Sequence, residues 1–347
     1  MKFFSIKWKL FLRVFISATL VFFTAMSIIF YNVNRLTKES AINYLENKSL
    51  EYAGQIRESL EYPLQDISVL KKSIETVTAS IPNEKKRFFI NNLLKKYIED
   101  NKNIYGVWVA YEPNALDNMD SVYANTEGHD KTGGFLPYWY REDGKILMSP
   151  PDYKEELKED FFTIPKLNDK ETFISPYLEE INGKKIVMVT LAIPIKKDGK
   201  FLGVIGVDVA QDYFMTIVNN CKPYEGGYGF LLSNDGMIVA HPQVNQIGTN
   251  IFKSEKEFHN KIGTKQSIDN GKIFNFTKVS SISKENMIYQ GTPFKIGKTG
   301  AKMAFVVTAP LNMVMENANK IKIIFIVIAV IGILIIGGVA YFSVIPF

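Results

Sequence analysis

Apolar residues are concentrated at the two ends of the chain. Residues 14–31 form an eighteen-residue segment without a charged side chain, and residues 323–341 form a second segment of nineteen. A helix needs roughly 20 predominantly apolar residues to cross a bilayer. The pattern therefore predicts two transmembrane helices, over residues 14–31 and 321–342, with a cleaved signal peptide as the alternative for the first.

The region that follows the first apolar segment has a helical pattern. From Ile42 to Val77, apolar residues recur at intervals of three and four and their sums, which predicts a long helix. Pro63 should kink or bend this helix rather than end it. A second helix is predicted over residues 81–101. We interpret residues 32–102 as stalk helices that leave the membrane directly.

After residue 102 the pattern changes to strands rich in β-branched and aromatic residues. A first unit has strands predicted within residues 104–113, 133–148, 184–195 and 201–210, and a short helix over residues 209–220 closes it. A second, smaller unit has strands within residues 228–242, 272–280, 285–296 and 301–310. Each unit ends on an antiparallel pair, so the pattern predicts two α+β modules in tandem, over residues 103–220 and 221–312.

The charges place the region between the apolar segments outside the cell. Four basic residues, the last of them Arg13, precede the first segment, so the positive-inside rule keeps residues 1–13 in the cytoplasm. Residues 32–320 are then extracellular, and residues 343–347 form a cytoplasmic stub. The outer region holds 36 of the 41 basic residues and all 36 acidic residues, so the basic excess of the chain lies at the membrane flanks and is no sign of nucleic-acid binding, which would need a basic face on the folded domain.

The stub is too short to hold a cytoplasmic signalling domain, so we expect a working receptor to have such a domain that this chain lacks. Cys221 is the only cysteine, which excludes an intrachain disulfide and suits a bacterial cell surface. The motifs HExxH, GxSxG and GxxxxGK[ST] do not occur. His241 could be a ligand or a base, but the pattern favours a structural role at the end of a strand. His129 lies in a polar loop and is expected to be exposed. We therefore expect no catalytic residue, no metal and no cofactor.

A cluster of aromatic residues is the better candidate for a site, because Tyr and Trp provide apolar walls together with polar atoms. Together with Asp208, the candidate ligand-binding residues are Tyr138, Trp139, Tyr140, Tyr153, Phe161, Phe162 and Tyr177. Packing in the protein core is the alternative for each aromatic residue. Strand alternation also directs Trp139 away from Tyr138 and Tyr140.

Four segments, in this order and between two apolar helices, resemble one family. These are "GGFLPYWYR", "ISPYLEE", "IPIKKDGKFLGVIGVDV" and "GYGFLLSNDGMIVAHPQVNQIG". Over residues 35–312 the chain resembles the double Cache family, the extracellular sensors of bacterial chemoreceptors, sensor kinases and cyclic-dinucleotide enzymes. The resemblance implies two PAS-like modules, with the ligand pocket in the membrane-distal one. The apolar stripe of residues 36–78 further predicts a homodimer along the stalk.

The resemblance leaves the ligand open. Amino-acid-sensing members of the family carry an Arg two residues before a Trp-Tyr pair. In this chain, Phe161 and Phe162 replace the pair, and Glu159 stands where the Arg would be. Tyr177 and Asp208 match the remaining positions, so the half of the motif that faces an amine is present. The resemblance therefore allows an amine or another small polar metabolite as the ligand as readily as an amino acid.

Asp208 ends an apolar strand, and two interpretations compete for it. It is either the N-cap of the next helix, with Gln211 completing a capping box, or the floor of the pocket, where it accepts hydrogen bonds from a ligand ammonium. Alternation puts Asp208 on the same face as Gly206, which predicts open space beside the carboxylate.

The leading hypothesis is a transmembrane chemoreceptor that binds a small polar metabolite, either an amine or an amino acid-like compound. A sensor region of a histidine kinase or a cyclic-dinucleotide enzyme is the first alternative. A membrane-tethered binding or adhesion module, or a tethered enzyme, remains a further alternative.

Overall fold

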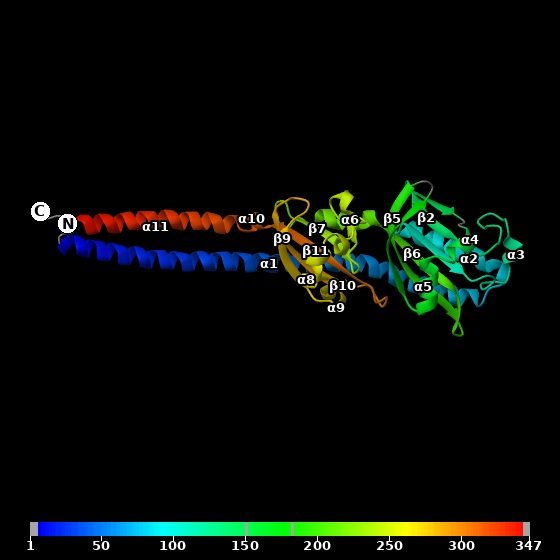
Figure 1. Cartoon of the computed structure of the whole chain (residues 1–347). Coiled ribbons are helices and arrows are strands. Elements are labelled where there is room, and N and C mark those ends of the chain that lie inside the picture. Colours follow the sequence, from blue (N-terminus) through cyan, green and yellow to red (C-terminus); the bar gives the residue numbers. More distant parts are fainter. Residues whose placement is uncertain (1–5, 150–151, 182–183, 343–347) are drawn as a thin grey trace.

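Helix α1 (Ile6–Thr78) runs along nearly the whole molecule. In the computed structural model, which describes residues 6–149, 152–181 and 184–342, this helix of 73 residues continues through Pro63 without interruption (Figure 1). Helix α11 (Glu316–Phe342) lies beside its N-terminal part. Both helices contain stretches that are long and apolar enough to cross a membrane, and neither stretch is buried within the molecule. The predicted stub 343–347 lies outside the described residues.

The first sheet has six antiparallel strands in the spatial order β3-β2-β1-β6-β5-β4. Its strands are β1 (Gly106–Tyr111), β2 (Tyr138–Glu142), β3 (Lys145–Ser149), β4 (Thr172–Ile181), β5 (Lys184–Lys197) and β6 (Lys200–Ala210). The short helices on this unit are α3 (Asp120–Tyr123), α4 (Tyr153–Glu156) and α5 (Asp160–Asn168).

Alternation along the central strands divides this sheet into two faces. Val107 and Val207 belong to the large core that the sheet forms with α1 and α2 (Asn83–Asp100). Trp108 and Val204 face the other way, into a smaller cluster with Tyr153 and Phe162 of α4 and α5. The sheet is therefore covered by long helices on one face and by short helices on the other.

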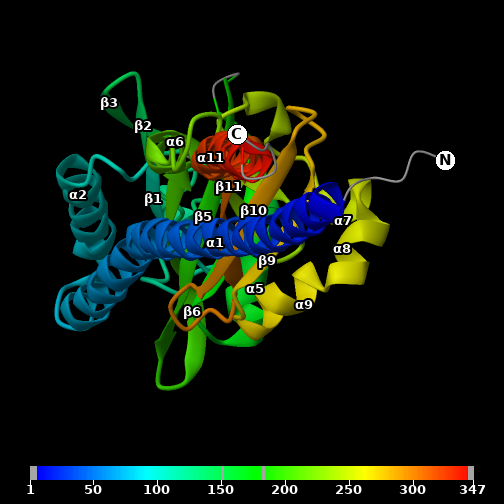
Figure 2. The same cartoon turned by 90° about the vertical axis from the view of Figure 1, so that its left-hand side faces the viewer.

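The second sheet has the spatial order β8-β7-β11-β10-β9. Its strands are β7 (Tyr228–Ser233), β8 (Ile238–Ala240), β9 (Phe274–Val279), β10 (Asn286–Lys295) and β11 (Lys302–Pro310). Helix α6 (Gln211–Asn220) leads into this unit, which also contains η1 (Val244–Gln246), α7 (Ile251–Ser254), α8 (Lys256–Ile262) and α9 (Thr264–Asn270). Seen from the end that carries both termini, α7–α9 lie on the other side of α1 from α2 (Figure 2).

The second sheet also packs on α1, chiefly through β10 and β11. A buried hydrogen bond of 2.6 Å joins the hydroxyl oxygens of Ser49 in α1 and Thr292 in β10. From β11 the chain continues through α10 (Leu311–Val314) directly into α11. The second unit is thus the part of the protein that adjoins the apolar helices.

The predicted fold class is confirmed: a long N-terminal helix carries two antiparallel sheets, and an apolar helix ends the described chain. The domain boundaries of residues 103–220 and 221–312 stay a prediction. Some elements were not predicted from the sequence, namely strand β4 and the short helices α4, α5 and α7–α9.

Candidate ligand pocket

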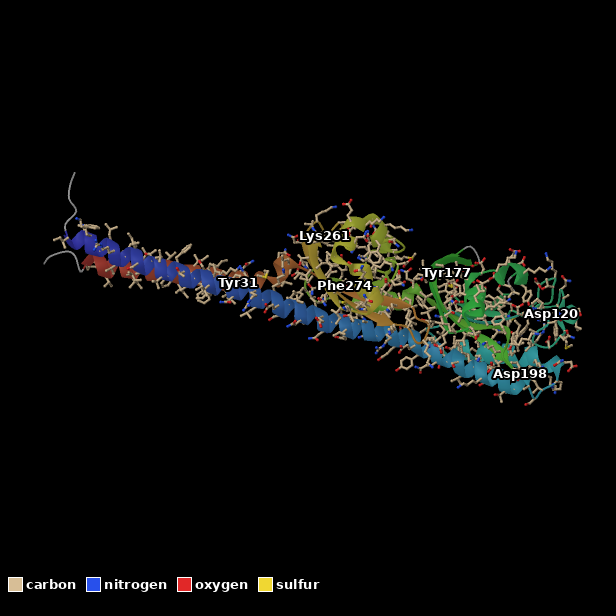
Figure 3. The ribbon with its side chains drawn as sticks, turned by 60° about the horizontal axis from the view of Figure 1, so that its bottom comes forward. Tyr31, Asp120, Tyr177, Asp198, Lys261 and Phe274 are labelled. Carbon is tan, nitrogen blue, oxygen red and sulfur yellow. The ribbon has the colours of Figure 1, made fainter. Side chains whose placement is uncertain are left out.

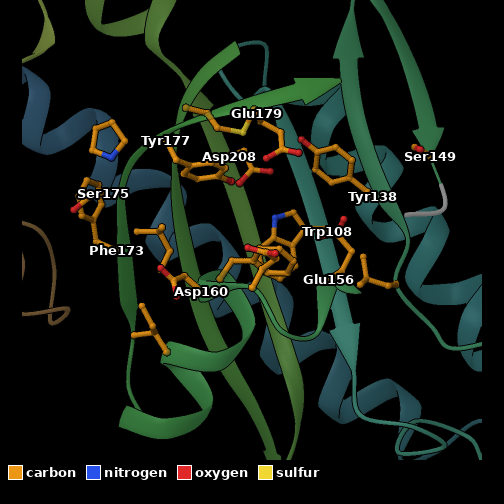
Figure 4. A pocket seen from close by; sticks show the side chains of 17 residues that line it. Trp108, Tyr138, Ser149, Glu156, Asp160, Phe173, Ser175, Tyr177, Glu179 and Asp208 are labelled. Carbon is orange, nitrogen blue, oxygen red and sulfur yellow. The ribbon is translucent and has the colours of Figure 1, made fainter. Parts of the chain in front are cut away.

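A pocket of about 780 Å³ lies between the first sheet and the short helices α4 and α5. Tyr177 locates it within the unit farther from the apolar helices (Figure 3). Its aromatic and acidic lining residues are Trp108, Tyr138, Phe161, Phe173 and Tyr177, with Glu156, Glu159, Asp160, Glu179 and Asp208 (Figure 4). The remaining lining residues are Leu136, Ser149, Ile164, Ile174, Ser175, Pro176 and Met188. No lysine, arginine or histidine is among these described residues.

Asp208 lies in the wall that the sheet contributes, and it is only 3% exposed. Thr190 is its direct neighbour across the β5–β6 ladder and donates a hydrogen bond of 2.5 Å to Oδ1 of Asp208. The hydroxyl oxygens of Thr190 and Tyr177 are 2.9 Å apart. Because the Thr190 proton points to the carboxylate, Tyr177 is the donor in that second bond. A relay of hydroxyl groups thus ends on Asp208.

Gly106 and Gly206 leave room for two further side chains that donate hydrogen bonds to Asp208. Trp108 and Tyr138 also donate side-chain hydrogen bonds to its carboxylate. A Cβ on Gly206 would lie 2.2 Å from the Trp108 ring, and a Cβ on Gly106 would lie 2.6 Å from the Tyr138 hydroxyl. The prediction of open space beside Asp208 is therefore wrong. The Trp108 indole fills the space that a side chain at position 206 would occupy.

The alternative role of Asp208 as a helix cap is also wrong. Helix α6 begins at Gln211, and Ala210 occupies the N-cap position without a side-chain hydrogen bond. Asp208 itself lies within β6, where its backbone carbonyl accepts a hydrogen bond of 2.9 Å from Tyr105. The carboxylate is thus held by pocket side chains and not by the start of the next helix.

Burial and mutual repulsion disfavour the ionised form of the pocket acids. Burial raises the pKa of Asp208 to about 6, although the hydrogen bonds from Thr190, Trp108 and Tyr138 act in the opposite direction. Burial, together with the charges of Glu179 and Glu159, raises the pKa of Glu156 to about 7. The pKa of Tyr177 rises because of burial and the Asp208 charge, which keeps this phenol protonated as a donor.

Four of the eight candidate residues line the pocket: Tyr138, Phe161, Tyr177 and Asp208. Trp139 lies on the opposite face, as alternation requires, and donates a hydrogen bond of 3.1 Å from Nε1 to Asn91. Tyr140 is buried and stacks on Tyr138 from the same face of β2, so it packs beside a lining residue without lining the pocket itself.

The other two candidates pack in the core beneath the pocket. The hydroxyl of Tyr153 donates a buried hydrogen bond of 2.6 Å to the Tyr111 carbonyl. Phe162 is buried against the edge of Phe201. Trp139, Tyr140, Tyr153 and Phe162 are therefore not among the lining residues, and core packing accounts for each of them.

Sequence reasoning missed the pocket acids other than Asp208. Glu156 and Glu159 come from α4 and from the residue that precedes α5, whereas Glu179 comes from β4. The one available signal was Glu159, which occupies the position of an expected arginine. Among the described residues, no group of three or more His, Cys, Asp or Glu could hold a metal ion.

Comparison with known proteins identifies the class of domain. Residues 90–215 match the family model described as "Methyl-accepting chemotaxis protein-like, first PDC sensor domain". The methyl-accepting chemotaxis protein TlpQ of Pseudomonas aeruginosa is 24% identical over 192 residues, which are 50% of this chain and 27% of that protein. The methyl-accepting chemotaxis protein PscA of Pseudomonas syringae pv. tomato is 33% identical over 115 residues, covering 32% of this chain and 18% of that protein.

Among solved structures, the extracellular domain of the putative histidine kinase mmHK1S-Z3 is similar over 82% of this chain and 98% of its own. The two are 26% identical, with a TM-score of 0.68. Residues 90–215 therefore form a sensor domain of the Cache or PDC class, as in methyl-accepting chemotaxis proteins, and the fold as a whole is similar to that of an extracellular sensor domain. The chain spans only about a quarter of the length of the first of its curated relatives.

Proposed function

We propose that the chain is the extracellular ligand-sensing part of a transmembrane chemoreceptor and that its ligand is a small organic cation. The supporting observation is the pocket of about 780 Å³, whose described lining has five carboxylic acids and no basic residue. Asp208 would accept a hydrogen bond from a ligand ammonium at the pocket floor. The proposal is one of binding and signalling, not of catalysis.

The charge of the pocket favours an amine over an α-amino acid. An amino acid brings a carboxylate, and a buried carboxylate needs a cation or several donors to offset its loss of hydration. Glu159 lines the pocket and, by the resemblance, stands where amino-acid-sensing members of the family carry an arginine, so it would repel that carboxylate. An ammonium group, in contrast, would be attracted by every ionised acid of the pocket.

Signalling would use the connection from the second unit to α11. Ligand binding can shift an equilibrium only if the ligand has different affinities for two conformations. A small displacement of β11 would reach α11 through the four residues of α10. Two membrane spans, an extracellular region of residues 32–320 and a homodimer along α1 belong to the same proposal.

A sensor histidine kinase is the second candidate. It is favoured by the likeness to two extracellular domains of putative histidine kinases, which are 26% and 27% identical to this chain. Both outputs would use the same pocket. The gene region after codon 347 distinguishes them, since long heptad helices indicate a chemoreceptor and a kinase domain indicates the alternative.

The pocket assignment is tested by Asp208→Ala in the full chain, held in lipid nanodiscs. A thermal-shift screen of amines supplies the ligand, and calorimetry then measures its affinity. Loss of the carboxylate should weaken binding by about 2 kcal/mol or more, because a buried charged pair loses one partner. Asp212→Ala, on the exposed side of α6, is the control and should bind normally. Normal binding by Asp208→Ala would contradict the assignment.

A further inference from the structure

The acids of the pocket fall into two groups that come from opposite walls. Asp208 of β6 and Glu179 of β4 belong to the sheet, and we call them the inner acidic group. Glu156 ends α4, and Glu159 and Asp160 stand at the start of α5; these three are the outer acidic group. In the close view, Asp208 and Glu179 lie above the Trp108 ring, and Glu156 and Asp160 lie below it (Figure 4).

Asp208 and the outer group differ in how much of their charge the protein already offsets. Asp208 accepts hydrogen bonds from Thr190, Trp108 and Tyr138. The carboxylates of the outer group, by contrast, make no ion pair with a lysine or arginine among the described residues. Neighbouring basic residues are engaged elsewhere, since Lys158 pairs with Glu155, and Lys166 pairs with Glu112.

One cation cannot balance both groups. A single ammonium at Asp208 would leave the outer acids to repel one another. After burial, the charges of Glu179 across the pocket and of Glu159 within the outer group already raise the pKa of Glu156. A second cation at the outer group would remove this repulsion. The surface between the groups suits an alkyl chain, because Trp108 and Phe161 meet edge to face there with ring centroids 4.7 Å apart.

We infer that the ligand is an organic dication, such as an α,ω-diaminoalkane, with one ammonium at each acidic group and its alkyl chain against Trp108 and Phe161. This inference rests on the proposed function and adds a requirement to it. The inner group alone recognises an amine. The outer group selects amines that carry a second positive charge and rejects those that carry a carboxylate.

Calorimetry on the full chain in lipid nanodiscs tests the inference. The probes are the diamines from 1,3-diaminopropane to 1,6-diaminohexane, the 1-aminoalkane of each matching length, and 4-aminobutanoate. At least one diamine should bind about tenfold or more tightly than its matching monoamine, since it gains a second charged pair. 4-Aminobutanoate should bind more weakly than either.

The variants Glu156→Gln and Glu159→Gln assign the second charge to the outer group. Each should reduce the preference for diamine over monoamine severalfold, and the double variant should abolish it. Glu155→Gln is the matched control, because Glu155 is a neighbouring exposed acid that pairs with Lys158 and does not line the pocket. It should keep the full preference. Diamine binding should also release protons near pH 7, measured as a dependence of the heat on the buffer, since Glu156 must ionise.

The outcomes separate this inference from the proposed function. Equal affinity for diamine and monoamine, both lost in Asp208→Ala, would overturn the dication and leave the amine sensor standing. An unchanged preference in the double variant would also overturn the dication. Binding of none of the amines, or tighter binding of 4-aminobutanoate than of any diamine, would overturn both.

Discussion

The buried carboxylate of Asp208 lowers the stability of the ligand-free protein, and this cost in free energy points to a role in ligand binding. A carboxylate that is 97% shielded from water loses most of its hydration, and three neutral donors recover only part of it. The pKa of about 6 expresses the same imbalance, because Asp208 holds its proton more tightly in the folded protein than at its ordinary pKa of 3.8. A cationic ligand would restore the missing compensation.

Replacement of Asp208 by Asn should therefore stabilise the ligand-free protein above pH 6. The folded pKa of about 6 is above the ordinary value of 3.8, so the proton on Asp208 adds stability that is present below pH 4 and lost as pH rises through 6. Asn has no such loss. The variant should exceed the native protein by up to about 3 kcal/mol at pH 8, and the difference should vanish near pH 4.

Urea unfolding of the ligand-free full chain across this pH range measures the effect. Asp212→Asn, an exposed position in α6, is the control and should leave the pH dependence unchanged. If the free energies of Asp208→Asn and the native protein run parallel from pH 4 to pH 8, the carboxylate is not destabilised by its surroundings, and this account of its cost is wrong.

At the same scale, the sequence predicted those pocket residues that the aromatic cluster and the resemblance can identify. Tyr138 and Phe161 follow from the cluster, and Tyr177 and Asp208 also match the resemblance. Trp108 could not be assigned, because its contact with Asp208 depends on the pairing of β1 with β6, strands that lie far apart in the chain. The outer acids were missed for a related reason: only tertiary packing brings α4 and α5 over the sheet.

At the scale of elements, the long and strongly periodic segments were predicted, as was the short helix α6, whereas α4, α5 and α7–α9 were not. Helix α1 and strands β5 and β6 have patterns that extend over ten or more residues. Helix α4 has four residues and α5 has nine, with Pro165 inside the latter. Helices this short are marginal on their own and form because packing stabilises them. Their sequences therefore carry little signal of their own.

The register of β1 against β6 makes Gly206 a critical position of the pocket wall. Gly206 faces Trp108 across the ladder, and its backbone supports the indole that donates to Asp208. Gly206→Ala should push that ring away, because the added Cβ would lie 2.2 Å from it. We expect a loss of about 1–3 kcal/mol in unfolding free energy, as for other overpacked cores, together with weaker amine binding.

Tryptophan fluorescence, urea unfolding and calorimetry measure these effects. Gly54→Ala in α1 is a useful control, because an added Cβ there has no atom within 4 Å. That variant should gain about 1 kcal/mol, since Ala favours a helix over Gly, and should bind normally. Unchanged stability and binding in Gly206→Ala would mean that Trp108 does not depend on this glycine.

At the scale of the whole molecule, the two units are connected by α1 and α6, and they also contact each other directly. The turn between β10 and β11 reaches the first unit, where the backbone N–H of Lys298 donates a hydrogen bond of 3.2 Å to Oε2 of Glu171. Glu171 directly precedes β4, whose next residues line the pocket. Strand β11 continues through α10 into α11. A movement of the pocket wall thus has a short route to the apolar helix.

Glu171→Ala should separate ligand binding from its effect on α11. The side chain lies outside the pocket lining, so amine affinity should stay within about twofold, while the response of α11 should fall because the turn loses its hold on the first unit. Cysteines at Phe22 and Gly332, which lie in contact between α1 and α11, report that response through their crosslinking rate in nanodiscs. The buried Cys221 is first replaced by serine. Glu171→Gln keeps an acceptor oxygen and should retain the ligand-dependent change in rate. A full change in Glu171→Ala would show that the signal reaches α11 through α1 or α6 instead.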